Sequence, residues 1–368
     1  MSVTDENDLK GEAVRVGSTT ETLGEKIGSG SEGDVYRLRS TGEAVAKLFY
    51  ESIRTKKENK ILAMVEEENQ PRDKLYEERG VRSIIWPQEV VKSVRTDAFI
   101  GYKMPEKDLN EVENAHLYAL TQLNHDESNL EDRVRVAFNL AYMIHTIHQQ
   151  GHAIGDFNDD NIFVNNDGYV TMIDCDAFHI KTNNNVYSGE TFFPRYTPPE
   201  GRPKNLRGVR EADKFCLGVH VFQFLMAGAH PYEAIGGEAA TGNLEDMINE
   251  NSFPYETSTT DVVPRQHHKA MYENLPSSVR ELFVKCFNVA GKNIALGRPS
   301  PKRWVRTLGK VYQIPAAQLP NGSTGVENEK SNVADEIFGD DETADKTEAK
   351  TKAEDLDGPD EIFGDKNS

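Results

Sequence analysis

Short stretches of alternating apolar and polar residues dominate the first third of the chain. Such alternation is typical of β-strands with one buried face, and glycine-containing or polar segments separate the stretches. The expected strands are 22–27, 34–39, 44–49, 81–86, 89–93 and 98–104. One stretch, 56–68, has helical character instead. The pattern therefore predicts a small β-rich unit with one helix.

The hydrophobic period becomes helical after residue 130. Apolar residues then recur at helical spacing: Ala137, Leu140, Ala141, Ile144 and Ile147. Gly151 supplies a C-terminal stop, and 162–164 with 170–172 read as a short hairpin. Further helices are expected at 215–226, 275–287 and 301–308. The whole chain is therefore expected to be α+β, with a larger, mainly helical second part.

Both ends of the chain are polar. Residues 1–20 read as a flexible N-terminus, and 316–368 read as a disordered acidic tail with too little apolar surface to fold. The tail carries 15 Asp or Glu against 5 Lys, which accounts for over half of the net charge of −19. One hexapeptide, Asp-Glu-Ile-Phe-Gly-Asp, occurs twice in it, at Asp335–Asp340 and Asp360–Asp365. We interpret these repeats as a bivalent docking motif for a partner protein.

The composition excludes several classes of function. No basic tract suggests binding to nucleic acid or to an anionic membrane surface. The most apolar segment, 215–229, is too short to span a bilayer. Three scattered cysteines imply no disulfide framework, and the N-terminus lacks the pattern of a signal peptide. A cytoplasmic protein is expected.

Glycines follow the first predicted strand and could bring backbone N–H groups close to phosphates. They are Gly28, Gly30 and Gly33, with Val35 directly after them on the next strand. Lys47 lies on the third predicted strand among apolar neighbours. A lysine inside a sheet is costly unless an anion meets it. A phosphate-bearing ligand is therefore expected between the glycines and Lys47.

A second set of polar residues carries hard oxygen ligands. Asp156 stands five residues before Asn161, and Asp174 follows Asn161 by thirteen residues, after the predicted hairpin. A hairpin between them can bring these side chains to one site, and oxygen ligands of this kind suit Mg²⁺. The alternative is a turn rich in Asp and Asn that only bends the chain.

Taken in order, these residues resemble the protein-kinase superfamily. Three later positions extend the resemblance: Glu200 at the end of Thr197–Glu200, Asp213 and Arg298. Further motifs are similar to a divergent prokaryotic family of kinase-like proteins, whose members often accompany phosphatase and von Willebrand A-type proteins. These motifs are Leu275-Pro276, Leu282-Phe283, Cys286-Phe287 and Arg298-Pro299. The resemblance covers about residues 22–313.

The resemblance implies a two-lobed protein-kinase-like fold over 21–315, with a small lobe at about 21–104 and a large lobe at about 105–315. It implies that ATP and Mg²⁺ or Mn²⁺ are cofactors and that a protein is the substrate. A phosphatase or a von Willebrand A-type protein is a possible partner. The implied reaction is phosphoryl transfer to Ser or Thr hydroxyls in prokaryotic signalling or stress response.

Individual roles follow from the same resemblance. Gly28, Gly30, Gly33 and Val35 would cover the nucleotide, Lys47 would hold the α- and β-phosphates, and Met104 would lie at the hinge beside adenine. Asp156 would accept the proton of the attacking hydroxyl, and Asn161, Asp174 and Asp176 would be the metal ligands. Glu58 is the expected partner of Lys47 on the following helix, with Glu66 or Glu67 as alternatives.

Three departures from the family pattern leave other functions open. Ile154-Gly155 replaces the usual His-Arg before the catalytic aspartate, Asn158 replaces the usual lysine after it, and Asp176 replaces the glycine of Asp-Phe-Gly. A missing cation lowers the stabilisation of the transition state. A pseudokinase or ATP-binding scaffold is therefore one alternative. A small-molecule kinase is the other, because in such enzymes a second acidic residue follows the metal-binding aspartate.

Overall fold

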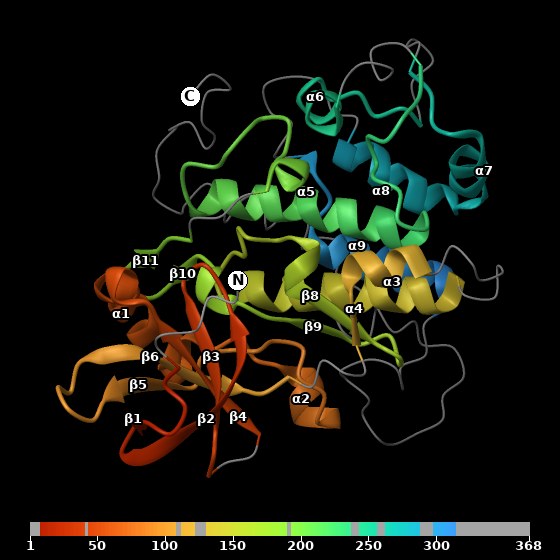
Figure 1. Ribbon diagram of the computed structural model, residues 1–368. Coiled ribbons are helices and arrows are strands. Elements are labelled where there is room, and N and C mark those ends of the chain that lie inside the picture. The colour runs from red at the N-terminus through yellow and green to blue at the C-terminus, as the bar shows by residue number, and fades with distance from the viewer. Residues whose placement is uncertain are drawn as a thin grey trace, which may run out of the picture.

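The computed structural model describes residues 8–40, 43–107, 112–121, 130–189, 193–236, 243–255, 262–287 and 297–313. They form a small β-rich lobe and a larger helical lobe, as Figure 1 shows, so the two-lobed α+β prediction is confirmed. Both copies of the Asp-Glu-Ile-Phe-Gly-Asp repeat lie outside the described residues.

Six antiparallel strands of the small lobe close into a barrel in the order β1-β2-β3-β4-β6-β5. Their bounds are β1 Ala13–Val16, β2 Thr19–Ser29, β3 Gly33–Leu38, β4 Ala44–Phe49, β5 Glu89–Ser93 and β6 Phe99–Pro105. Val14, Leu23, Tyr36 and Val91 are buried inside the barrel. Closure gives each of these six strands a partner on both sides.

The predicted flexible N-terminus over 1–20 is wrong for its second half. The short strand β1 pairs with β2, where Val14 faces Glu21, and also with β5, where Val14 faces Ser93. Val14 and Val16 are almost fully buried, which stabilises a four-residue strand that would be too short alone.

Residues 81–86 were expected to form a strand, and the structure, which describes them, shows that they do not. Ile84, Ile85 and Trp86 are buried in the main hydrophobic core rather than paired along a ladder, apart from one isolated bridge between Ile84 and Met172. The apolar run therefore reflects packing between the lobes. The N–H of Ile85 donates to the C=O of Met172 at 2.9 Å, which fixes this contact.

Helix α1, Glu51–Val65, begins five residues before the predicted stretch and packs on the barrel against β5 and β6. The short helix α2, Lys74–Arg79, follows it. Trp86 donates its indole N–H to the C=O of Met64 at 2.8 Å and so ties the end of α1 to the core.

The large lobe is built around two long helices, α4 Leu130–Gln149 and α5 Leu206–Leu225, which pack on each other (Figure 1). Helix α9, Pro301–Tyr312, packs on α4, and helix α8, Ser277–Phe287, packs on α5. The smaller helices are α3 Ala115–Thr121, α6 Leu244–Asn249 and α7 Gln266–Asn274. As its apolar sequence predicts, α5 is buried along most of its length.

Among the described residues, one short strand lies before α4, and four lie between α4 and α5. They are β7 Val112–Asn114, β8 Ile162–Asn165, β9 Val170–Met172, β10 Ile180–Lys181 and β11 Val186–Tyr187. The hairpin of β8 and β9 is the one that the sequence predicts, and β7 adds a third strand to it. Within the described ranges, no helix is both long enough and apolar enough to cross a membrane.

Candidate active site

A cavity of about 550 Å³ lies between the two lobes. Its size is that of a site for a nucleotide-sized molecule. The predicted residues that line it come from both lobes: Gly28, Gly30, Gly33, Val35, Lys47, Met104, Asp156, Asp174 and Asp176. The structure therefore brings the glycine-rich loop, the strand lysine and the carboxylates of two later loops to one place.

The glycines of the β2–β3 loop have different roles. A Cβ atom at Gly33 would lie 2.2 Å from the carbonyl oxygen of Leu48, so the fold itself requires glycine there. At Gly28 and Gly30, by contrast, the nearest atoms to an added Cβ are 3.7 and 3.8 Å away. The protein does not need glycine at these two positions for its own packing. A ligand that approaches the backbone closely accounts for both.

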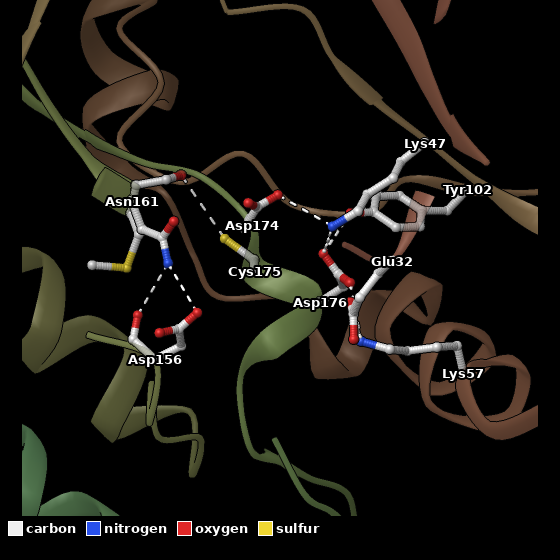
Figure 2. Close-up of polar contacts among 10 residues, drawn as sticks. Glu32, Lys47, Lys57, Tyr102, Asp156, Asn161, Asp174, Cys175 and Asp176 are labelled. Carbon is white, nitrogen blue, oxygen red and sulfur yellow. Dashed lines mark hydrogen bonds and ion pairs between the residues drawn. The ribbon is translucent and has the colours of Figure 1, made fainter. Parts of the chain in front are cut away.

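Lys47 lies between two carboxylates of the large lobe. Its Nζ is 2.8 Å from Oδ1 of Asp176 and 3.2 Å from Oδ1 of Asp174 (Figure 2). Burial disfavours the ammonium form of Lys47, but these two carboxylates outweigh burial and raise its pKa. Lys47 is therefore a fixed positive charge in the cavity, as phosphate binding requires.

Glu58 is not the partner of Lys47, so this prediction is wrong. Helix α1 instead directs Lys57 towards the site, where its Nζ is 3.4 Å from Oδ2 of Asp176 and 2.6 Å from Oε2 of Glu32. The acidic partner of Lys47 was expected on the helix. In the structure this partner is Asp176, in the loop after β9.

Asp176 is also wrongly predicted as a metal ligand. Its side chain is fully buried, and its oxygens accept hydrogen bonds from Lys47, Lys57 and the hydroxyl of Tyr102, which lies 2.8 Å from Oδ1. Burial acts to raise the pKa of Asp176, but the two lysines hold it well below the usual range. The carboxylate is an ion-pair centre with little capacity left for a metal.

Asp174 and Asn161 are the remaining metal-ligand candidates. The Asp174 side chain is 46% exposed in the cavity wall, and its backbone adopts the left-handed conformation, which costs a non-glycine residue about 1–2 kcal/mol. Asn161 donates through Nδ2 to Asp156 at 3.2 Å, so its amide oxygen is the atom that a metal would use. Within the described part of the chain, no group of three His, Cys, Asp or Glu side chains could hold a metal alone. This donor set fits Mg²⁺, which usually takes one or two protein carboxylates and completes its coordination with water and phosphate.

Asp156 lies in the loop after α4 and is held by two amides. Asn158 donates to its Oδ1 at 2.8 Å, and Asn161 donates to its Oδ2. Burial raises the pKa of Asp156, and the two amide hydrogen bonds offset this only in part. A carboxylate that is half-buried, oriented and more basic than usual is suited to accept a proton.

Replacing Asn158 by alanine should shift the acidic limb of the pH–rate profile to higher pH. The hydrogen bond from Asn158 stabilises the ionised form of Asp156, so its loss raises the pKa of that carboxyl further. Because the base must be ionised to accept a proton, activity would be lost at a higher pH on acidification. The measurement is kcat/KM against pH, with Asn165→Ala as a control. An unchanged limb would show that Asp156 does not set it.

Asp213 of α5 holds the loop of Asp156 in place through hydrogen bonds to its backbone. The N–H of Ile154 donates to its Oδ2 at 2.8 Å, and the N–H of Gly155 donates to its Oδ1 at 3.0 Å. His148 lies 2.9 Å from the same Oδ2. The position of Asp156 is therefore set by the buried centre of the large lobe rather than by a surface loop.

The segment after the cavity is held by a second buried ion pair. Arg298 makes a two-pronged contact with Glu200, with Nη2 2.8 Å from Oε2, and the Arg298 side chain has no exposed area. Both residues belong to the positions through which the sequence resembles the protein-kinase superfamily. Bidentate pairs of this kind fix geometry as well as charge.

Met104 lies at the cavity, but its backbone is not free for adenine. The residue pairs with Val45 across β4 and β6, and the N–H of Glu106 donates to the C=O of Glu43. Hydrogen-bonding directions alternate along an antiparallel ladder, so the N–H and C=O of Met104 also face β4. Its side chain lines the cavity, whereas the C=O of Pro105 points away from β4 and is the better adenine contact.

Sequence reasoning missed Glu32, Lys57 and Tyr102. Two signals were available: Lys57 is in the same helix turn as the chosen Glu58, and Tyr102 faces Lys47 across β4 and β6. Neither shows that a carboxylate more than 70 residues later in the sequence would meet both side chains.

Comparison with known proteins identifies a family and relatives for this chain. Residues 22–302 match the protein kinase domain family. The chain is 28% identical over 302 residues to protein kinase YegI of Escherichia coli strain K12, and equally to that of E. coli O157:H7, which covers 79% of this chain and 45% of each relative. It thus spans less than half the length of these relatives.

A solved structure gives the fold independently. ROP2 from Toxoplasma gondii, described as a virulence factor with a protein-kinase fold and no enzymatic activity, matches with a TM-score of 0.52 at 15% identity. The match covers 83% of this chain and 85% of that one. At this identity it shows the fold alone. With a family match over most of its length and this arrangement of lobes and loops, the chain belongs to the protein kinase family.

Proposed function

We propose that this chain transfers the γ-phosphate of Mg–ATP to Ser or Thr hydroxyls of protein substrates. One observation carries the proposal: Lys47, Asp156 and Asp174 line a single cavity of nucleotide size between the lobes. The set provides a cation for phosphate, a base for the attacking hydroxyl and a carboxylate for the metal.

This mechanism assigns one role to each residue of the site. Lys47 would hold the phosphates, Asn161 and Asp174 would hold the metal, and Asp156 would orient the acceptor hydroxyl and take its proton. Bound Mg²⁺ would neutralise charge on the phosphate oxygens. The buried pair of Glu200 and Arg298 supports the surface next to Asp156, where a polypeptide acceptor would lie.

Incubation of the full chain with labelled ATP and Mg²⁺ or Mn²⁺ tests the proposal. We expect label in a generic protein substrate, and acid hydrolysis of that product should give phosphoserine or phosphothreonine. Label in phosphotyrosine would contradict the specificity. Label only in aminoglycoside or choline acceptors would favour a small-molecule kinase instead.

A nucleotide-binding scaffold is the second candidate, and Asn158 is the observation in its favour. At the position of the usual lysine, this amide bonds to Asp156 and brings no positive charge. Binding of ATP without transfer to any acceptor would select this alternative.

Phosphorylation of the segment 174–200 should not switch the protein on. A phosphate would need an arginine beside Asp156 to pair with, but Gly155 stands there, and a Cβ atom at this glycine would already lie 2.9 Å from the ring of His179. Arg210, one alternative cation, already donates to the C=O groups of His152 and His148 at 3.1 and 2.8 Å. Strands β10 and β11 hold the start of the segment without a phosphate.

The test replaces the segment's hydroxyl residues one at a time and compares turnover with phosphatase-treated protein. The residues are Thr182, Tyr187, Ser188, Thr191 and Thr197. We expect changes below about tenfold, which is about 1.4 kcal/mol in the barrier. A larger loss in either experiment would show that a phosphate switch exists.

A further inference from the structure

Helix α1 presents a lysine to the active site at the place where an acidic partner for Lys47 was expected. The Lys57 side chain is only 12% exposed, and it bridges Glu32 at 2.6 Å and Asp176 at 3.4 Å (Figure 2). A lysine this deeply buried is costly unless its charge is matched. Here two carboxylates match it, one at the mouth of the cavity and one inside.

Two cations meet at Asp176. Lys47 and Lys57 both approach this one fully buried carboxylate, and Tyr102 adds a neutral hydrogen bond. Each lysine also contacts a second carboxylate, Asp174 for Lys47 and Glu32 for Lys57. One cation is enough to neutralise Asp176, so either lysine can remain with it while the other turns to another anion in the cavity.

The phosphates of ATP are the anion that the proposed function supplies. When the ammonium of Lys47 moves to the phosphates, Asp176 would lose its closest cation while remaining buried. Lys57 stays beside it, together with Tyr102. The buried carboxylate therefore keeps a counter-charge, and Lys47 can be shared with the nucleotide at little cost.

The same contacts join three separate segments of the site. Glu32 lies in the glycine-rich loop, Lys57 in α1, and Asp176 in the turn Cys175–Ala177 that follows Asp174. Because Asp176 is only two residues from Asp174, contacts that hold the Asp176 side chain in place also restrict the position of the Asp174 side chain. The bridge thus connects the loop over the nucleotide to the metal ligand beneath it.

We propose that Lys57 is a positioning residue of this site, the basic counterpart on α1 that retains Asp176 and Glu32 so that Lys47 can engage the phosphates. The inference rests on the proposed use of ATP. It does not require that transfer to protein occurs, because its main consequence is on nucleotide binding.

The test is equilibrium binding of a fluorescent ATP analogue with Mn²⁺ to the full chain. Lys57→Met should weaken binding about tenfold, since Asp176 would then hold Lys47 back from the phosphates. Lys57→Arg, which keeps the charge, should bind within about threefold of the original protein. Lys10→Met, which removes an exposed lysine paired with Glu25 in the same lobe, is the control and should change nothing.

A double substitution separates charge from packing. Asp176→Asn replaces the carboxylate by a neutral amide that needs no cation. Adding Lys57→Met to this variant should therefore weaken binding of the analogue less than about threefold relative to Asp176→Asn alone. A full tenfold loss in that background, or equally weak binding by Lys57→Arg, would overturn the proposal. Thermal melting of every variant identifies any that do not fold, and the Lys57→Arg and Asp176→Asn results then decide.

The outcome is distinguishable from failure of the proposed function. If the original protein binds the analogue and the Lys57 variants behave as expected, but no acceptor is labelled, protein kinase activity is wrong and the role of Lys57 stands. If acceptor is labelled while Lys57→Met binds and turns over like the original protein, the role of Lys57 is wrong and the kinase activity stands.

Discussion

Replacing Asp156 or Asp174 by alanine is expected to abolish phosphoryl transfer while the fold remains intact. Asp156 is the candidate proton acceptor, and loss of a positioned base costs roughly 10²–10⁴-fold in rate. Of the two predicted metal-binding carboxylates, Asp174 is partly exposed in the cavity wall, whereas Asp176 is fully buried. Loss of Asp174 should be at least as severe, because the metal neutralises charge throughout the reaction.

Nucleotide binding should separate the two residues. Asp174→Ala should weaken metal-dependent binding of ATP, since it removes the carboxylate in the cavity wall that is the candidate metal ligand. Asp156→Ala should leave binding nearly unchanged, because its contacts are to Asn158 and Asn161 within its own loop.

Single-turnover assays and titration with ATP, each with and without Mn²⁺, measure both effects. Asp160→Ala is a matched control, since this exposed aspartate lies in the same loop and has no assigned role. Equal loss of ATP affinity in the Asp156 and Asp174 variants would contradict the division of roles between base and metal ligand.

Local sequence patterns predicted the parts of the site that depend on local geometry. Lys47 follows from an alternating strand, and Asp156, Asn161 and Asp174 follow from a helix end and a hairpin with fixed spacing. The structure places Lys47, Asp156 and Asp174 at one cavity, with Asn161 bonded to Asp156 beside it. In these cases the chemistry and the element that carries it are within a few residues of each other.

The errors arise where a distant segment decides the outcome. Glu58 was a reasonable partner for Lys47, but Asp176, 129 residues away in the sequence, pairs with Lys47 instead. The same carboxylate makes a lysine on α1, Lys57, favourable. Strand β1 has only four residues, and it is stabilised by pairing with β5, which no local pattern reveals. The apolar run at 84–86 is buried between the lobes, which has the same sequence signal as a buried strand.

Acidification should strongly destabilise this protein between about pH 6.5 and pH 4. Six described histidines have pKa values lowered by burial: His148, His152, His179, His220, His230 and His268. His179 and His220 have pKa values of about 4, and His230 of about 3, against 6.5 for an exposed histidine.

The sign follows from proton binding. Below pH 6.5 the unfolded chain takes up protons at these histidines, whereas the folded chain does not until a much lower pH. The free energy of unfolding therefore decreases as the pH is lowered. A shift from 6.5 to about 4 corresponds to about 3 kcal/mol for one histidine once the pH is below both values. Several such groups together match the whole stability of a typical domain, about 5–15 kcal/mol.

His220 offers the sharpest test, because its ring lies between two parts of the active site. It stacks on Phe157 of the Asp156 loop at 5.0 Å and on Tyr196 of the segment before Glu200 at 4.9 Å. His220→Phe keeps an aromatic ring in this stack and removes the titrating group. Urea unfolding between pH 7 and pH 4.5 should show a shallower loss of stability in this variant, by about 1.4 kcal/mol for each pH unit below 6.5.

Asn166→Ala changes an exposed residue that does not titrate, and this control should follow the pH dependence of the original protein. The comparison uses the slope against pH rather than stability at one pH, so a modest packing cost of the introduced phenylalanine ring at neutral pH does not affect it. Stability that is constant from pH 7 to pH 4.5 in the original protein, or a His220→Phe slope equal to that of the original, would show that these histidines are protonated in the folded state. The buried stack of Phe157, His220 and Tyr196 would then have to accommodate a charge, which burial of this extent opposes.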